Sequence, residues 1–361
     1  MKFDPINYGD YLKLDNILSA QNLRSKELGE EAHDETLFII IHQAYELWFK
    51  QIIHELDSVY KVFDTNRVKP TDLGTVNHRL NRIVEIQKVL NQQLDIIETM
   101  TPLDFMDFRD YLVPASGFQS IQFRLIELKL GLKQKYRLKI DKQFFNSRLS
   151  EANKNMLNEM EKLPTFLELL DNWLSRMPFG EGNEYDFWDQ YQVAIDKMLA
   201  QDEEIILNNE TLLEHEKRIE IMNLKSTREN FKILFDEEKY KELEDQGVIR
   251  LSRKAKLSAI FIKLFRDEPI LQIPNRMLDL LIDIDEMFTT WRYRHAIMVH
   301  RMIGTKIGTG GSSGHDYLKR STENNRVFID FFNLATFLLP KSHIPKLPNS
   351  LRKDLGFVYE D

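Results

Sequence analysis

The chain has 361 residues and a formal net charge of −8 at pH 7, so it is long enough for one large domain or two ordinary ones. Hydrophobic residues make up 42 % of it and charged residues 29 %, which is typical of a soluble globular protein with a sizeable core. The acidic balance offers no overall positive field to a phosphate backbone, so we do not expect a nucleic-acid partner. The absence of cysteine excludes disulfides and thiolate-bound metal cofactors, and any metal must be held by nitrogen or oxygen.

The N-terminus lacks the apolar core of a signal peptide, and no apolar stretch approaches the roughly 18 residues needed to span a bilayer. We therefore expect a cytoplasmic protein with no membrane partner. Glycine (14) and proline (11) are scarce for this length, and long intervals without either residue favour helices. No useful stretch alternates apolar and polar residues, so very little strand is expected. The sequence predicts an all-α fold.

In the first part of the chain, apolar residues recur three and four positions apart. This spacing predicts a long central helix over residues 34–63 and an amphipathic helix over about 75–100. A third helix is expected over 101–112. Pro114 interrupts it, and another helix follows over about 118–133.

From about residue 136 to 255 the composition becomes more charged and less regular. We interpret this segment as a peripheral helical insertion, in which a helix-like charged stretch over 197–246 presents a solvated face. A further helix is predicted over about 276–303, and an apolar segment over 328–340 is expected to be buried.

Three polar residues occur in apolar helical surroundings, where an uncompensated polar group is costly. Each has an aromatic residue four positions earlier, a spacing that places both side chains on one helix face. Three such faces could line one pocket with aromatic walls and polar corners, as small-molecule sites commonly have. The pairs are Phe38 with His42, Phe105 with Arg109, and Trp291 with His295.

Each polar residue has two interpretations. Arg109 could bind a carboxylate through two parallel hydrogen bonds, or it could form a salt bridge with a nearby aspartate. His42 could contact a ligand or pair with Glu46. His295 could be a metal ligand or a hydrogen-bonded core residue. The aspartates close to Arg109 are Asp104, Asp107 and Asp110.

The glycine and serine loop over 308–314 follows a predicted helix. It lacks the lysine of a phosphate-binding loop and the preceding strand of a dinucleotide motif. It could close over a substrate through Thr309 and backbone amides, or be a flexible connector. His300 lies five residues after His295, about 140° around a helix, so the two could not easily share a metal. Hydrolase motifs are absent from the sequence.

Three long motifs closely resemble the tryptophan 2,3-dioxygenase family. They are HQAYELWFKQ (42–51), DFRDYLVPASGFQSIQFR (107–124) and the run from WRYRH to the glycine loop (291–314). Similarity also covers 8–12 and 328–340, so the resemblance extends over most of the chain.

The resemblance implies an all-α haem-dioxygenase bundle, a single domain over 1–361, with the helical insertion within it. It further implies one haem b per subunit, with Fe(II) in the active form, and self-association as a homotetramer. The implied reaction inserts both atoms of O2 across the indole C2–C3 bond of L-tryptophan. The product is N-formylkynurenine, in the first step of tryptophan catabolism by the kynurenine pathway.

The resemblance also implies roles for particular residues. His295 matches the axial ligand of the haem iron. Arg109 matches the residue that binds the substrate carboxylate, and Thr309 the loop residue at the ammonium and carboxylate end. His42 matches the distal histidine at the active site, which faces the indole N–H and positions the substrate. The remaining matches are pocket walls at Phe38 and Phe105, cofactor contacts at Trp291, Ser116 and Arg124, and a contribution of Tyr8, Tyr11 and Leu12, in segment 1–20, to a neighbouring subunit's pocket.

Two alternatives remain at this stage. One is a haem-binding sensor or carrier without turnover, although such a protein has no use for amino-acid-binding residues such as Arg109 and Thr309. The other is a related haem enzyme that acts on a substituted indole or another aromatic amino acid. The source organism, kinetic constants and regulation do not follow from the sequence.

Overall fold

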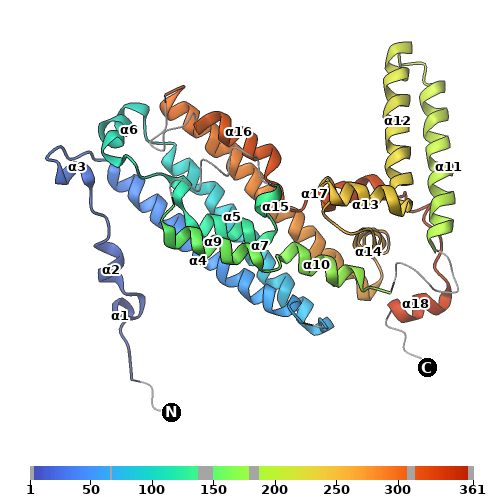
Figure 1. Cartoon of the computed structure of the whole chain (residues 1–361), viewed down its shortest axis with the longest axis horizontal. Helices are drawn as coiled ribbons and strands as arrows, with labels where there is room; N and C mark the ends of the chain where they lie inside the picture. The colour runs from blue at the N-terminus through green and yellow to red at the C-terminus, as the bar shows by residue number, and fades with distance from the viewer. Residues whose placement is uncertain (1–3, 66, 137–148, 179–186, 307–313, 357–361) are drawn as a thin grey trace.

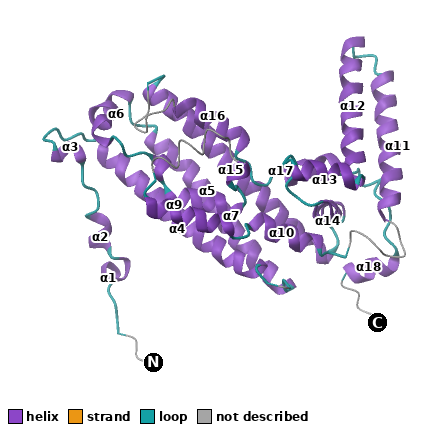
Figure 2. Cartoon of the chain, in the orientation of Figure 1, coloured by secondary structure: helices purple, strands orange, loops and turns teal. Residues whose placement is uncertain are grey.

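The computed structural model describes residues 4–65, 67–136, 149–178, 187–306 and 314–356. Within these ranges the chain forms helices joined by loops and contains no strand (Figure 2), which confirms the all-α prediction. None of the described helices is long and apolar enough to cross a membrane.

Three long helices form the centre of the molecule: α4 (Glu35–Phe63), α5 (Pro70–Ile97) and α15 (Pro269–Ile303). Helix α5 packs against both α4 and α15 (Figure 1). Their apolar residues, spaced three and four apart, face one another and are buried in one continuous core. The central bundle thus results from the periodicity visible in the sequence.

The central helices begin close to the predicted positions or earlier. Helix α4 begins one residue after the expected start, whereas α5 begins at Pro70 and α15 at Pro269. Proline is favoured in the first turn of a helix, where its missing N–H is not needed. The predicted start of α15 at residue 276 is too late, because Pro274 lies inside the helix although an interior proline usually breaks one.

After α5 the chain turns through a corner in which the helix ends are capped by side chains. Thr101 and Asp104 form a capping box at the start of α6 (Pro102–Arg109): the Thr101 amide donates to Asp104 Oδ2 at 2.9 Å, and the Asp104 amide donates to Thr101 Oγ1 at 3.3 Å. A short 3₁₀ turn, η1 (Asp110–Leu112), continues from α6. The predicted 101–112 helix is therefore present, with a tighter last turn.

Helix α7 (Ile121–Leu130) leaves this corner and packs along α4. Ser120 caps it by accepting a hydrogen bond from the Phe123 amide at 3.3 Å. The turn before it, η2 (Gly117–Gln119), is capped by Ser116. These caps fix the corner between α6 and α7.

The segment predicted as an insertion contains both core and projecting helices. Helix α9 (Glu151–Lys162) packs on α7, and α10 (Phe166–Ser175) packs on α4, α7 and α14 (Arg253–Leu264). Five residues of α10 are buried: Phe166, Leu167, Leu169, Leu170 and Leu174. This part of the segment therefore belongs to the core.

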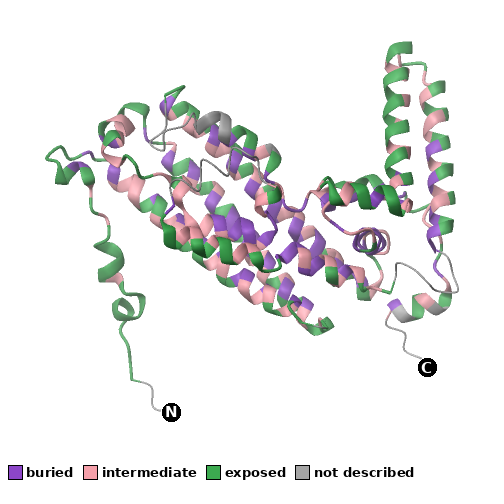
Figure 3. Ribbon diagram, in the orientation of Figure 1, coloured by how far each residue is buried: buried purple, intermediate pink, exposed green. Residues whose placement is uncertain are grey.

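Helices α11 (Phe187–Asn208) and α12 (Glu214–Phe235) form a hairpin that projects from the body (Figure 1). Its buried side chains lie near the base, and the tip is mostly exposed (Figure 3). The charged stretch predicted as helix-like over 197–246 is helical but not continuous, because the chain turns after α11 and breaks again before α13 (Glu237–Asp245). At the second break the Asp236 side chain caps α13 by accepting from the Lys239 amide at 3.1 Å.

The C-terminal part returns to the bundle. Helix α16 (Gly314–Asn324), which the sequence did not predict, packs along α15. The apolar segment predicted over 328–340 forms α17 (Ile329–Phe332) and the 3₁₀ helix η4 (Asn333–Phe337), and Phe331, Leu334 and Phe337 are buried. A last helix, α18 (Asn349–Leu355), follows.

The N-terminal segment lies apart from the bundle. Helices α1 (Tyr8–Leu12) and α2 (Leu14–Leu18) contain no buried residue, and Figure 1 shows the segment running away from the body. The short helix α3 (Arg24–Glu27) connects it to α4, through Glu35, whose carboxylate accepts from the Arg24 and Ser25 amides at 2.8 and 2.9 Å.

Candidate active site

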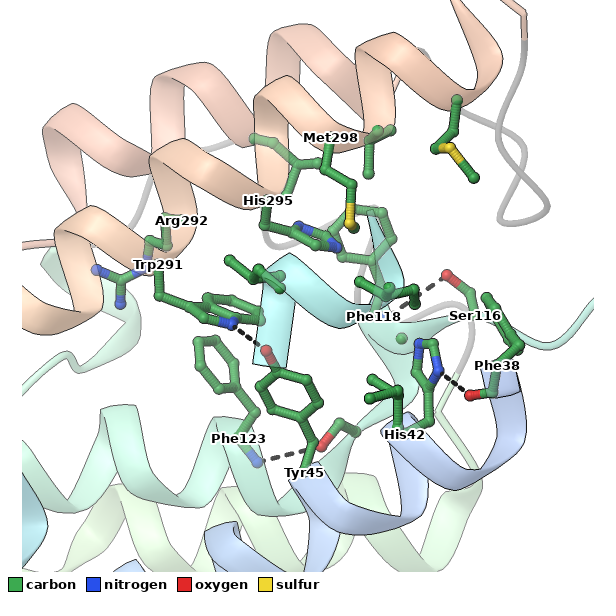
Figure 4. A pocket seen from close by; sticks show the side chains of 18 of the residues that line it. Phe38, His42, Tyr45, Ser116, Phe118, Phe123, Trp291, Arg292, His295 and Met298 are labelled. Carbon is green, nitrogen blue, oxygen red and sulfur yellow. Dashed lines mark hydrogen bonds between the residues drawn. The ribbon is translucent and has the colours of Figure 1, made fainter. Parts of the chain in front are cut away.

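A cavity with a volume of about 270 Å³ lies between α4, α5, α6, α7, α15 and α16. Its walls are mostly apolar. It brings together residues from four separate parts of the sequence that were predicted to act together, and Figure 4 shows several of them around the cavity. The predicted site residues that line it are Phe38, His42, Phe105, Arg109, Ser116, Arg124, Trp291 and His295.

His295 points from α15 into the cavity (Figure 4). Its ring stacks on the Trp291 indole, with the ring centroids 5.0 Å apart and the planes within 5°. Nδ1 of His295 is buried and has no hydrogen-bond partner among the described residues. Burial lowers the pKa of His295 to about 4, and the nearby His42 contributes in the same direction. The imidazole is therefore neutral at pH 7, the form that binds a metal.

A hydrogen bond to Tyr45 of α4 holds the Trp291 indole. Its Nε1–H donates to Tyr45 Oη at 3.2 Å, and the Tyr45 hydroxyl donates to the Leu90 carbonyl of α5 at 2.6 Å. Tyr45 is buried, and this burial raises its pKa to about 12. The sequence analysis did not single out Tyr45, because a tyrosine on the apolar face of a helix resembles any other core residue.

A buried ionic group borders the same cavity. Glu127 accepts from Arg124 at 2.7 Å and from Arg292 at 2.8 Å, and Arg292 also donates to the Asn325 carbonyl at 3.0 Å. All three charged side chains are buried. Two cations and one anion give this group a formal charge of +1. Glu127 and Arg292 were missed by the sequence analysis, although Arg124 and Glu127 stand three residues apart on one helix face.

His42 lies on α4, across the cavity from His295 (Figure 4). Its Nδ1 is 2.6 Å from the Phe38 carbonyl oxygen, and since a carbonyl can only accept, Nδ1 carries the proton. Much of the ring surface faces the cavity, yet the surrounding protein desolvates the ring and lowers its pKa; the Phe38 carbonyl and Glu46 oppose this shift. Nε2 of the neutral ring is therefore a hydrogen-bond acceptor.

Glu46 does not form the pair with His42 that the sequence left open. Its carboxylate instead accepts from the Gln122 side chain of α7 at 2.7 Å. Nε2 of His42 is therefore not used in a pair with Glu46 and faces the cavity. This arrangement favours the ligand-contact interpretation of His42 over the ion-pair interpretation.

Arg109 is the last residue of α6 and borders the cavity. It forms an ion pair with Asp110 Oδ1 at 3.3 Å, whereas Asp104 is used in the capping box. The Arg109 side chain is 17 % exposed and that of Asp110 is 85 % exposed. An ion pair with so exposed a carboxylate is weak.

The wall between His42 and Arg109 is aromatic. The rings of Phe38, Phe105 and Phe108 contact one another with centroid distances of 5.4 to 5.8 Å. Phe108 is fully buried behind the other two. A flat aromatic ligand would find apolar, preformed contacts here.

Three of the predicted site residues that the structure describes are not among those that line the cavity. Tyr8 and Tyr11 are 75 % and 71 % exposed, and Leu12 is also exposed. All three lie on α1, in the segment that runs away from the helical body (Figure 1). Thr309 falls outside the described residues.

These features define a class: a helical protein whose buried, neutral histidine is suited to bind a metal cofactor. The comparisons with known proteins specify this class further. The family model for tryptophan 2,3-dioxygenase matches residues 3–338. The chain belongs to the tryptophan 2,3-dioxygenase family, which confirms the resemblance found in the sequence.

Curated relatives carry the same name and are similar over nearly their whole length. The tryptophan 2,3-dioxygenase of Alteromonas mediterranea is 54 % identical over 357 residues, which cover 99 % of each chain. That of Bdellovibrio bacteriovorus is 50 % identical over 360 residues, 99 % of this chain and 100 % of the relative. That of Dictyostelium discoideum is 45 % identical over 355 residues, 98 % of this chain and 89 % of the relative.

Proposed function

We propose that this chain oxidises L-tryptophan by inserting both atoms of O2 across the indole C2–C3 bond, giving N-formylkynurenine as the first step of the kynurenine pathway. It would do so with one haem b per subunit, whose iron is ferrous in the active form. The observation that carries the proposal is the placement of His295 and His42 on opposite sides of one aromatic cavity.

The residues around the cavity fit haem. The neutral His295 imidazole, whose Nδ1 lacks a partner among the described residues, suits an axial iron ligand. The group formed by Arg124, Glu127 and Arg292 is positive and suits the carboxylates of the cofactor. Ser116 lies at the cavity edge, where it would contact the macrocycle. When bound, haem supplies the oxygen chemistry, and the protein supplies binding and orientation.

The other side of the cavity would hold L-tryptophan. Phe38 and Phe105 would pack against the indole, and Nε2 of His42 would accept a hydrogen bond from the indole N–H. The Arg109 guanidinium would bind the substrate carboxylate through two parallel hydrogen bonds. His42 therefore positions the ring and need not act as a base. Holding the substrate in one orientation in a dry pocket lowers the entropic part of the barrier.

Two further parts of the proposal concern segments away from the cavity wall. Thr309 would meet the ammonium and carboxylate end of the substrate. Tyr8, Tyr11 and Leu12 would complete the pocket of a neighbouring subunit in a homotetramer. Their exposure in the single chain supports this second role, because one short helical turn cannot bury its own apolar face. We further propose a cytoplasmic location.

The test is product analysis with isotopically labelled dioxygen. Haem-loaded, reduced protein is mixed with L-tryptophan under ¹⁸O2, and the product is identified by mass spectrometry. The proposal predicts N-formylkynurenine that carries two labelled oxygen atoms. A protein that binds haem and dioxygen but forms no product would be a carrier or sensor, and a product with one labelled oxygen would contradict dioxygenation. Substituted indoles in parallel reactions would define the substrate range.

A further inference from the structure

Behind His295 lies a chain of contacts that joins three helices. The Leu90 carbonyl of α5 accepts from the Tyr45 hydroxyl of α4 at 2.6 Å, and Tyr45 Oη accepts from Trp291 Nε1 of α15 at 3.2 Å. The Trp291 ring in turn stacks on His295 with planes within 5°. Figure 4 shows the hydrogen bond between Trp291 and Tyr45 and the stacked rings above it.

The direction of each hydrogen bond is fixed by chemistry. A carbonyl oxygen cannot donate, so the single hydroxyl proton of Tyr45 points to Leu90 and a lone pair is directed at Trp291. The indole N–H can only donate. Each group therefore has one role, and neither can turn away without leaving a buried polar group unsatisfied, which is costly.

Packing further restricts the indole. The Phe123 ring lies 5.3 Å from the Trp291 ring, and the Tyr45 ring lies 6.0 Å from it in an edge-on arrangement. The indole therefore cannot tilt independently of its neighbours. A parallel stacked imidazole is restricted with it, because rotating the His295 ring about its bond to Cβ would drive one ring edge into the indole.

Metal-binding histidines usually donate their second ring nitrogen to a carboxylate or carbonyl, and this bond fixes the ring orientation. Nδ1 of His295 has no such partner among the described residues. The stack on Trp291 is then the contact that sets the plane of the His295 ring. How precisely the His295 ring is oriented therefore depends on the contacts that hold Trp291.

We propose that Tyr45 is a positioning residue for the axial ligand: its hydroxyl holds the Trp291 indole parallel to His295 and so sets the orientation of the imidazole toward the iron. This inference rests on the proposed haem-dependent function. Tyr45 touches neither substrate nor iron in this role and acts through Trp291.

The test compares two matched variants. Tyr45→Phe removes only the hydroxyl that holds Trp291. Tyr240→Phe is the control, because the Tyr240 hydroxyl is also buried and also donates to a backbone carbonyl, that of Leu251, at 2.9 Å, but outside the cavity. Tyr45→Phe loses the hydrogen bonds to Leu90 and Trp291 and Tyr240→Phe loses the one to Leu251, so both should lower the free energy of unfolding.

Of the two matched variants, Tyr45→Phe should change the iron–histidine bond and Tyr240→Phe should not. The readouts are the iron–histidine stretching band in the resonance Raman spectrum of the ferrous protein and the rate of haem transfer to a scavenger protein. In Tyr45→Phe we expect the band to shift or broaden and haem loss to become roughly fivefold faster, which corresponds to the loss of the one hydrogen bond that holds Trp291. Trp291→Phe should give a similar shift, and adding Tyr45→Phe to it should change little more, because both disrupt the same hydrogen bond.

An unshifted band in Tyr45→Phe, with haem loss no faster than in Tyr240→Phe, would leave Tyr45 a merely structural residue. Additive effects in the double variant would also contradict the inference. If the wild-type protein shows no iron–histidine band that depends on His295, the proposed haem function fails first and this inference fails with it. The two failures are thus distinguishable.

Discussion

The two sides of the cavity are built differently. On the proposed cofactor side, residues of other helices, Tyr45 and Glu127, hold Trp291 and Arg292 of α15, and His295 stacks on Trp291. On the proposed substrate side, His42 bonds to the backbone of Phe38 in its own helix, and Arg109 pairs with the adjacent Asp110. A cofactor that stays bound requires a fixed ligand, whereas a substrate site must admit and release its ligand at every turnover.

The largest effect is expected from removing His295, the proposed ligand of the haem iron. His295→Ala should fold but lose haem and all dioxygenase activity, because no other described histidine lines the cavity except His42 on the substrate side. His300→Ala is the control, since His300 lies outside the cavity on the exposed part of α15, and it should retain haem. Absorption spectra after haem reconstitution measure both variants. Haem loss in His300→Ala with retention in His295→Ala would reverse the assignment.

The difference between the proposed cofactor and substrate sides should also appear in the free energy of unfolding. Glu127→Ala leaves two buried arginines without their shared carboxylate and should lower the free energy of unfolding by about 3 to 5 kcal/mol. Asp110→Ala removes only an exposed partner of Arg109 and should cost at most about 1 kcal/mol. Urea denaturation of the apo proteins gives both values. Similar small losses in the two variants would mean that the cofactor side is no more tightly integrated than the substrate side.

A variant of Arg109 tests whether this residue binds the substrate carboxylate. Arg109→Ala should weaken L-tryptophan binding by about 2 to 5 kcal/mol, because the substrate carboxylate loses a charged partner in a dry pocket. Tryptamine lacks the carboxylate and should be affected much less. Turnover of both compounds by wild-type and variant protein provides the measurement. An equal loss for tryptamine would exclude a carboxylate-binding role.

The cofactor side should make the apo protein sensitive to acid. The folded-state pKa of His295 is about 4 and its ordinary value is 6.5. Between these values the unfolded chain binds more protons than the folded chain, so the free energy of unfolding falls as the pH drops from 6.5 to 4. The contribution is at most about 3 kcal/mol. Denaturation at several pH values should show a shallower fall in His295→Phe, and an identical slope in both proteins would argue against a shielded His295.

The smallest effect is expected from subunit exchange. A variant lacking residues 1–14 and an Arg109→Ala variant should each be weakly active or inactive alone. Mixed oligomers, formed by dissociating and reassociating the two, should recover part of the activity, because some pockets would combine an intact N-terminal segment with an intact Arg109. Mixed oligomers that form but stay inactive would show that each segment serves its own pocket.

Much of the fold and the identity of several cavity residues followed from local sequence patterns. The four-residue spacing that joins His42 to Phe38, and His295 to Trp291, correctly placed each pair on one helix face, and these faces meet at one cavity. The capped break at Asp236 was missed, because a charged residue in a charged stretch gives no distinct signal of a helix end.

Contacts between residues far apart in the sequence could not be predicted from local sequence patterns. Glu127 and Arg292 are separated by 165 residues, and Tyr45 and Trp291 by 246. Only packing of the central helices shows that they meet. The roles of Thr309 and of Tyr8 also depend on information beyond local spacing, and they remain predictions from family resemblance.

Haem content measured together with substrate binding in one variant tests the division of the cavity most directly. Arg109→Ala is loaded with haem, its haem-to-protein ratio is determined, and L-tryptophan is titrated while the haem spectrum is recorded. We predict one haem per chain, as in the wild type, and a spectral response that requires far more L-tryptophan. Loss of haem together with substrate binding would contradict the assignment of separate cofactor and substrate sides.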